Sequence, residues 1–137
     1  MSGTPSIPDD AFTVFVPGTP VPQGSKTAFV VGRRAVVTDQ NKARLKPWRA
    51  TVSEYADTGH SFDGPVTVRL LFILPRPQRP RWVRPAVKPD IDKLARAVLD
   101  GITDAGLIDD DARVVTLIVH KEYGTPVGVH IHVEAAA

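Results

Sequence analysis

The sequence predicts one mixed α/β domain, in which a β-sheet of about five or six strands packs with two main helices. Three observations support this prediction of one α+β domain. The chain has 137 residues, which suits one domain with one core. Two segments carry apolar residues at helical spacing, and several others alternate as strands do. The first residues are polar and contain Pro and Gly, so we expect a flexible segment over 1–10 and the domain over 11–137.

The first half of the chain carries the patterns of a strand, a hairpin and a helix. Residues 12–16 read as a strand, and residues 28–31 and 35–38 flank a Gly-Arg-Arg turn that is typical of a hairpin. Apolar residues three or four apart predict a helix within residues 41–58. Pro47 favours a helix start just before it, because proline fits the first turn of a helix.

Residues 66–74 form the strongest strand pattern in the sequence. Every second residue is apolar, and the second half is apolar on both faces, as in a central strand. A proline-rich basic loop follows over residues 75–85, and an unstructured loop of this length is usually functional or disordered.

The last third of the chain predicts a second helix and two strands. Asp90 suits the N-cap position, and an apolar stripe continues to about Asp104, where Gly106 suits the end of the helix. Residues 114–120 and 127–133 read as strands joined by a short link, so we expect them to pair as a terminal hairpin.

The net charge of +2 conceals a strong segregation of charge. Residues 26–49 contain seven basic side chains and one acid, and residues 64–89 contain six basic side chains and no acid. Residues 90–111 contain seven aspartates and two basic side chains. Each block taken alone is explained by a solvated face, but two basic blocks beside an acidic one favour a polyanionic partner and a cation.

The acidic block has the spacing of a candidate metal centre. Asp92 and Arg96 are four apart and share one face of the predicted helix, so they can face a cleft together. The aspartates at 109–111 follow the helix and return toward Asp90 only if helix and strand pack closely. Carboxylate oxygens are the ligands that Mg²⁺ prefers. A helix cap, an ordinary ion pair and a solvated turn would explain the same residues without a metal.

The segment from Lys88 to Lys121 resembles the RusA-type Holliday junction resolvases of phages and prophages. The family pattern is Asp-x-Asp-Asn-Leu-x-Lys, then Leu-Asp-x-Leu-x-x-x-Gly, then a paired Asp before a strand. The matching residues here are Asp90, Asp92, Leu94, Leu99, Asp100, Gly106, Asp110 and Asp111, with no gap from the first aspartate to the last. This close match covers about a quarter of the chain.

The resemblance implies a Mg²⁺-dependent endodeoxyribonuclease of DNA recombination and repair, with Mn²⁺ as a substitute. It implies that Asp90, Asp92 and Asp111 are the metal ligands, with Asp110 close by. It also implies a homodimer that nicks two strands of a four-way DNA junction symmetrically, in the cytoplasm of a bacterium or an infected host.

Two departures from the family pattern bear on the chemistry. Lys93 stands where the family has Asn, and Arg96 stands where it has the catalytic Lys. Arginine stays protonated, so Arg96 is not a general base, but it can hold the scissile phosphate. The substitutions bear on rate and cleavage specificity more than on the reaction class.

The hypothesis that follows is in-line attack on phosphorus by a metal-activated water, which leaves a 5′-phosphate and a 3′-hydroxyl. Basic residues would bind backbone phosphates, so that affinity falls steeply with salt. The candidates are Lys42, Arg44, Lys46, Arg49, Arg76, Arg79, Arg81, Arg84, Lys88 and Lys93. Trp82 would stack on an unpaired base or anchor the loop to the core. The competing functions are a catalytically silent nucleic-acid-binding module and a flap- or RNA-directed nuclease with the same centre.

Other classes of site are weak or excluded. The chain has no cysteine, so disulfides and thiolate metal sites are excluded, and no window suits a membrane helix or a signal peptide. The Gly-Ser-Lys at residues 24–26 lacks the spacing of a P-loop. His130 and His132 share one face of a strand but have no third partner by sequence.

Overall fold

The computed structural model describes residues 11–24, 26–31, 34–39 and 42–136, without the side chains of residues 26–42. The predicted flexible segment over residues 1–10 lies outside the described part of the chain. The described elements are β1 (Ala11–Pro17), β2 (Lys26–Val31), β3 (Arg34–Asp39), α1 (Lys42–Ala56), β4 (Val66–Leu74), α2 (Ile91–Asp104), the 3₁₀ helix η1 (Asp111–Arg113), β5 (Val114–Tyr123) and β6 (Gly128–Ala135).

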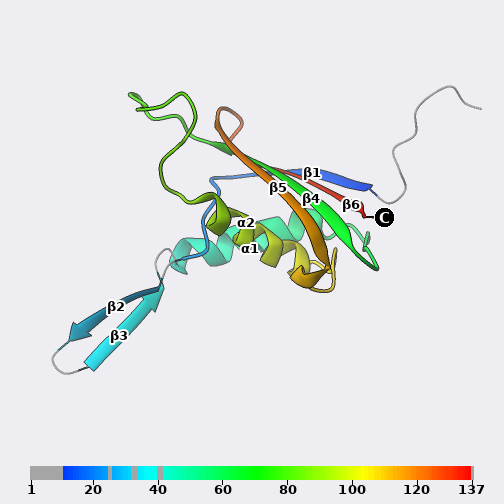
Figure 1. Cartoon of the computed structure of the whole chain (residues 1–137), viewed down its shortest axis with the longest axis horizontal. Helices are drawn as coiled ribbons and strands as arrows, with labels where there is room; N and C mark the ends of the chain where they lie inside the picture. Colours follow the sequence, from blue (N-terminus) through cyan, green and yellow to red (C-terminus); the bar gives the residue numbers. More distant parts are fainter. Residues whose placement is uncertain (1–10, 25, 32–33, 40–41, 137) are drawn as a thin grey trace, which may run out of the picture.

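The main sheet has four strands in the order β1-β6-β4-β5, and both helices pack on the same face of it (Figure 1). β4 and β5 are parallel, and the other two pairs are antiparallel. Parallel neighbours need a long crossover, which α2 provides between β4 and β5. The predicted class, a mixed α+β fold with two helices, is confirmed.

The predicted strand count and the terminal hairpin need correction. The described residues contain six strands, but β2 and β3 form a separate two-stranded sheet, so the main sheet has four strands rather than five or six. The predicted pairing of residues 114–120 with 127–133 is wrong, because β4 lies between β5 and β6. The physical reason is the apolar character of both faces of β4, which favours a central position over an edge.

Helix boundaries follow the apolar pattern, which predicts the first helix from about Asn41. α1 begins at Lys42, so only the later start suggested by Pro47 is wrong, and Pro47 lies inside the helix. The carbonyl left without a backbone donor by Pro47 belongs to Ala43, which is exposed and open to water. α2 has Asp90 at its N-cap position and ends at Asp104, and Gly106 adopts a positive φ of 78° just beyond it. These α2 boundaries are as predicted.

The core lies between the helices and the sheet. The inward side chains of β4 are all buried: Val66, Val68, Leu70 and Phe72. They meet buried residues of both helices, among them Val52 of α1 and Val98 of α2. The close approach of the helices depends on Gly101, where a Cβ atom would lie 2.6 Å from Cγ1 of Val52. Neither helix of the described part is long and apolar enough to span a membrane.

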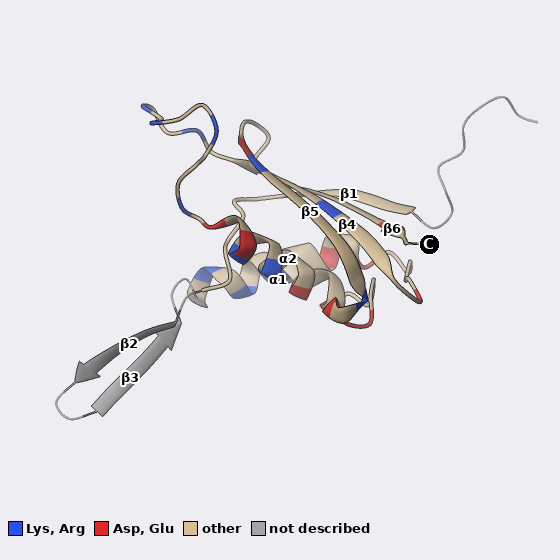
Figure 2. Cartoon of the chain, in the orientation of Figure 1, with Lys and Arg blue, Asp and Glu red and all other residues tan. Residues whose placement is uncertain are grey.

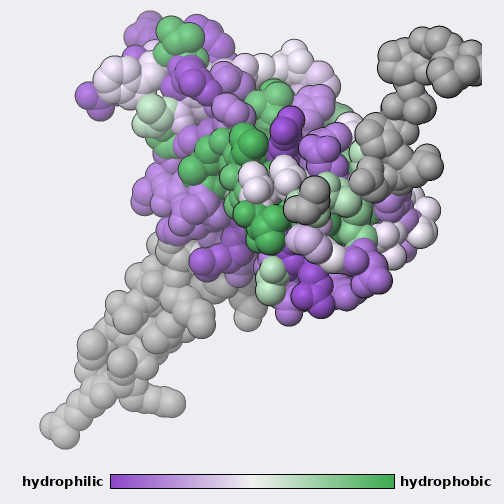
Figure 3. All heavy atoms as spheres, turned by 45° about the vertical axis from the view of Figure 1, so that its right-hand side comes forward, coloured by the Kyte–Doolittle hydropathy of each residue, from purple (hydrophilic) through white to green (hydrophobic). Residues whose placement is uncertain are grey.

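Hydrophobic surface remains exposed on β5, which lies at one end of the described sheet. The exposed side chains there include Val115, Leu117 and Ile118. Figure 3 shows hydrophobic surface gathered near the middle of the face that it draws, with hydrophilic atoms around it. An edge strand with apolar side chains is a surface that favours pairing with another chain.

Candidate active site

A surface hollow of about 430 Å³ brings together three of the predicted site residues. Asp92 and Arg96 line it from the first turns of α2, and Asp111 lines it from η1. Leu99 of α2 and Leu117 of β5 are among its apolar walls. The prediction that Asp92 and Arg96 face one cleft is confirmed, and the return of η1 toward α2 brings Asp111 to the same place.

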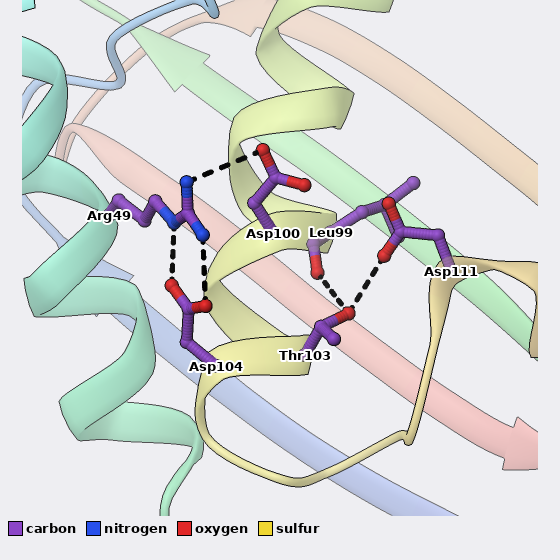
Figure 4. A network of polar contacts seen from close by, with 6 residues as sticks. All are labelled: Arg49, Leu99, Asp100, Thr103, Asp104 and Asp111. Carbon is purple, nitrogen blue, oxygen red and sulfur yellow. Dashed lines mark hydrogen bonds and ion pairs between the residues drawn. The ribbon is translucent and has the colours of Figure 1, made fainter.

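Asp111 is held by a threonine that the sequence did not single out. Thr103 Oγ1 lies 2.7 Å from Asp111 Oδ1 and 2.8 Å from the carbonyl oxygen of Leu99 (Figure 4). The hydroxyl has one proton for these two acceptors, and a carboxylate is the stronger acceptor. Thr103 therefore fixes the carboxylate of Asp111 against the last turn of α2.

Asp90 lies at the other side of the helix start. It lines a separate pocket together with Lys93, whose Nζ is 3.5 Å from Asp90 Oδ2. The Asp90 side chain makes no capping hydrogen bond with α2. Asp90 and Asp92 thus flank the first turn of the helix, and the structure places only Asp92 in the hollow with Asp111.

The backbone that carries Asp90 is fastened by Lys121 of β5. Lys121 Nζ donates to the carbonyl oxygen of Val87 at 2.7 Å and to that of Pro89 at 2.8 Å. Burial lowers the pKa of Lys121 below its ordinary value, and the negative charge of Asp90 opposes this change. Lys121 thus joins the end of the basic loop to the sheet, one residue before Asp90.

The other aspartates of the run have local partners. Asp110 caps η1 by accepting a hydrogen bond of 2.9 Å from the backbone nitrogen of Ala112. Asp109 lies 3.9 Å from Arg113. Asp110 is next to Asp111 in the chain but does not line the hollow.

Arg49, predicted to bind DNA, is engaged by two aspartates of α2 (Figure 4). Its guanidinium donates to both carboxylate oxygens of Asp104, at 2.5 and 2.9 Å, and lies 3.8 Å from Asp100. The hydrogen bond from Arg49 lowers the pKa of Asp104. Burial raises the pKa of Asp100, with Arg49 opposing and Asp111 reinforcing the change. This network ties α1 to α2 beside the hollow.

The basic loop between β4 and α2 carries most of the other predicted DNA-binding residues, and its ribbon is coloured blue at these positions in Figure 2. The exposed ones are Arg76, Arg79, Arg81, Arg84 and Lys88, and Arg84 pairs with Glu122 at 3.0 Å. Trp82 is 49% exposed, with Arg81 over its ring at 4.9 Å, so it is not a core anchor. Arg44 and Lys46 are exposed on α1, and the side chain of Lys42 lies outside the described residues.

The residues that line the hollow have the type of ligand atoms that bind a hard cation. Asp92 and Asp111 are exposed carboxylates on one hollow, and carboxylate oxygens suit Mg²⁺ or Mn²⁺. Within the described residues, no group of three or more His, Asp or Glu side chains lies close enough to hold one ion. His132, one of the two histidines on one face of a strand, has its Nδ1 atom 2.9 Å from Thr13 Oγ1. Two of the three predicted ligands therefore share the hollow, and Asp90 stands beside it.

Thr103 and Lys121 are the residues around the site that the sequence analysis missed. Thr103 lies one turn after Leu99, and its spacing alone reads as an ordinary helix position. Lys121 is a single cation near the end of an apolar strand, and such a residue usually points to solvent. Their roles come from contacts between segments distant in sequence.

Comparison with known proteins bears on the function. The model of a family described as Endodeoxyribonuclease RusA matches residues 17–134 of the chain. No curated protein matches the chain. The family match includes the basic loop, α2, η1 and β5, which together form the hollow and its surroundings.

Proposed function

The chain belongs to the RusA endodeoxyribonuclease family, and from this premise we propose that it resolves four-way DNA junctions by metal-dependent paired nicks. The observation that carries the proposal is the hollow that Asp92, Arg96 and Asp111 share. Metal-dependent phosphodiester hydrolysis on DNA uses carboxylates that can hold a metal ion and cations that bind phosphate. Here the carboxylates lie beside the guanidinium of Arg96 and near the basic loop.

Asp92 and Asp111, with Asp90 beside them, are the residues that would hold Mg²⁺ or Mn²⁺. The metal would lower the pKa of a bound water and neutralise charge on the phosphate. Arg96 would bind the scissile phosphate, because its guanidinium stays protonated and offers a planar fork of donors. Thr103 keeps Asp111 in place through its hydrogen bond of 2.7 Å. Leu99 and Leu117 would form the apolar walls beside a bound phosphate.

The DNA would follow the basic loop onto the hollow. The exposed arginines of residues 76–84 would contact backbone phosphates, which predicts a steep loss of affinity with salt. Two symmetric nicks need two centres, so we propose a homodimer. The exposed apolar side chains of β5 at the end of the sheet support such an association.

The test uses a labelled four-way junction and a linear duplex of matched sequence. Each is incubated with the protein, with and without Mg²⁺, beside Asp111→Asn and the control Asp63→Asn. Asp63 is an exposed aspartate that does not line the hollow, so its variant makes the same chemical change away from the site. We expect paired nicks in the junction with Mg²⁺ for the wild type and Asp63→Asn, and none for Asp111→Asn.

Other outcomes would select the competing functions. Tight junction binding without cleavage under any metal would favour a silent binding module. Cleavage of flaps or RNA in preference to junctions would keep the centre and change the substrate. Full Mg²⁺-dependent cleavage by Asp111→Asn would contradict the assignment of this residue.

A further inference from the structure

A second pocket, of about 460 Å³, lies directly beside the candidate active site. It is separate from the hollow, and Asp90 lines it while Asp92 lines the hollow. The Cα atoms of Asp90 and Asp92 are at most about 7 Å apart. The pocket and the hollow therefore open on either side of the first turn of α2. Asp90 and the cations that line the pocket have roles proposed above, but the rings that form its walls have none.

Much of the pocket wall is formed by rings, which stand on two loops and a strand end. Tyr123 comes from the end of β5, and the proline rings are Pro20, Pro22, Pro75, Pro77, Pro85 and Pro89. Proline fixes its own φ, so these walls are rigid. The volume falls in the range of pockets that take small-molecule ligands. The Tyr123 ring and the faces of the proline rings suit a planar group that stacks on them.

The charged and polar groups of the pocket suit a nucleotide. Arg44 and Lys88 line it together with Lys93, so cations stand around the apolar walls. Gln23 also lines it, and its backbone nitrogen donates to the carbonyl oxygen of Lys93 at 2.9 Å, which fixes this residue against α2. Gln23 Oε1 is buried and accepts no hydrogen bond from the described residues. Rotation of the side chain toward the pocket would give this oxygen a donor, such as the amino group of a base.

We propose that this pocket binds an unpaired nucleobase of the DNA next to the cleaved phosphate. The base stacks on Tyr123 and the proline rings, and its amino group is recognised by Gln23. Bases at a branch point are already partly unstacked, which lowers the cost of extrusion. The inference rests on the proposed function, because it takes branched DNA as the substrate. It assigns sequence preference at the cut to Tyr123 and Gln23 rather than to the basic loop.

The first experiment compares the two tyrosines of the chain. Tyr123→Ala removes a ring from the pocket, and Tyr55→Ala removes one from the exposed surface of α1 as a matched control. Cleavage is measured on an intact junction and on junctions with an abasic site beside the cut. Loss of stacking should slow cleavage of the intact junction about tenfold for Tyr123→Ala only. On the abasic junction, the wild type and Tyr123→Ala should be equally slow.

Two further variants test whether the effect comes from the ring and from the amide of the pocket. Tyr123→Leu keeps apolar volume without the ring, so it should slow cleavage as Tyr123→Ala does while the fold, followed by circular dichroism, is retained. Gln23→Leu should abolish the difference in rate between junctions with cytosine and with thymine beside the cut. If the abasic site slows Tyr123→Ala as much as the wild type, or has no effect on either, the pocket does not bind the base.

A binding measurement separates this inference from the proposed function. The fluorescent base 2-aminopurine is placed at the branch point, and the junction is titrated with protein in the absence of metal. A fluorescence change with the wild type and Tyr55→Ala, but not with Tyr123→Leu, supports the pocket even if no junction is cleaved. A change of equal size for all three proteins overturns it.

Discussion

Substitution of Gly101 by alanine tests how closely the two helices approach. A Cβ atom at this position would lie 2.6 Å from Cγ1 and 2.9 Å from Cβ of Val52, and 3.3 Å from the carbonyl oxygen of Arg49. Ordinary carbon contacts begin near 3.5 Å, so the helices must separate or shift by up to about 1 Å. Alanine stabilises a helix by about 1 kcal/mol relative to glycine. Overpacking typically costs about 1–3 kcal/mol.

The clash should win, because two of the three contacts are too short and the third is with backbone. We expect Gly101→Ala to lower the free energy of unfolding by about 1–2 kcal/mol, measured by urea denaturation and circular dichroism. Val52→Ala removes the Cγ1 atom of the shortest contact. The loss in free energy of unfolding for the double variant should therefore be smaller than the sum of the two single losses by about 0.5 kcal/mol or more.

A neutral or stabilising effect of Gly101→Ala would refute this account, because helix propensity alone would then decide the outcome. Strict additivity with Val52→Ala would refute the proposed contact. The result also bears on function, since α2 carries Asp92. Separation of the helices should slow junction cleavage more than the loss of stability explains.

Three further predictions follow from the contacts of the site. Thr103→Val should slow Mg²⁺-dependent cleavage about tenfold, because Asp111 loses a hydrogen bond worth about 1.5 kcal/mol. Thr103→Ser keeps the hydroxyl and should retain most activity. Cleavage rates on a labelled junction test this, and an equal loss for both variants would contradict it. Lys121→Met should raise the Mg²⁺ concentration for half-maximal cleavage, because the loop before the second helix loses two hydrogen bonds; a metal titration with an unchanged midpoint would argue against this role. Asp104→Asn should cost less than about 1 kcal/mol of stability at pH 7. Arg49 lowers the pKa of Asp104 below 3.8, so this stabilising contribution is present above that pH and is lost as the pH falls through the lowered pKa. Urea titrations at pH 3 to 7 should show that the free energies of unfolding of the wild type and Asp104→Asn converge only at low pH.

Local patterns predicted the elements that carry the site, because their stabilising contacts repeat at a fixed spacing. The apolar stripe and terminal glycine of α2 gave its boundaries, and the four-residue spacing of Asp92 and Arg96 gave their shared face. The order of strands was not predictable in the same way. A short link between β5 and β6 favours direct pairing, and only the packing of the whole sheet places β4 between them.

Charge patterns predicted which segments are basic, but not which side chains remain available to DNA. Arg49 and Arg84 both stand in basic blocks, yet the fold pairs them with Asp104 and Glu122. Such pairs join residues far apart in the chain, so no local count of charges identifies them. The same reason explains why the hydrogen bonds of Lys121 could not be predicted.

The attachment of the basic loop has a consequence for how this protein can vary. One end of the loop is held where Gly124 donates to the carbonyl oxygen of Leu74, and the other where Lys121 binds Val87 and Pro89. Both anchors lie at the same end of β5, so the intervening segment behaves as an insertion whose base has fixed geometry. Its tip can gain, lose or exchange residues without displacing Asp90. The strength of DNA binding can therefore vary through one exchangeable segment, while Asp90 and the residues that would read sequence at the cut stay as they are.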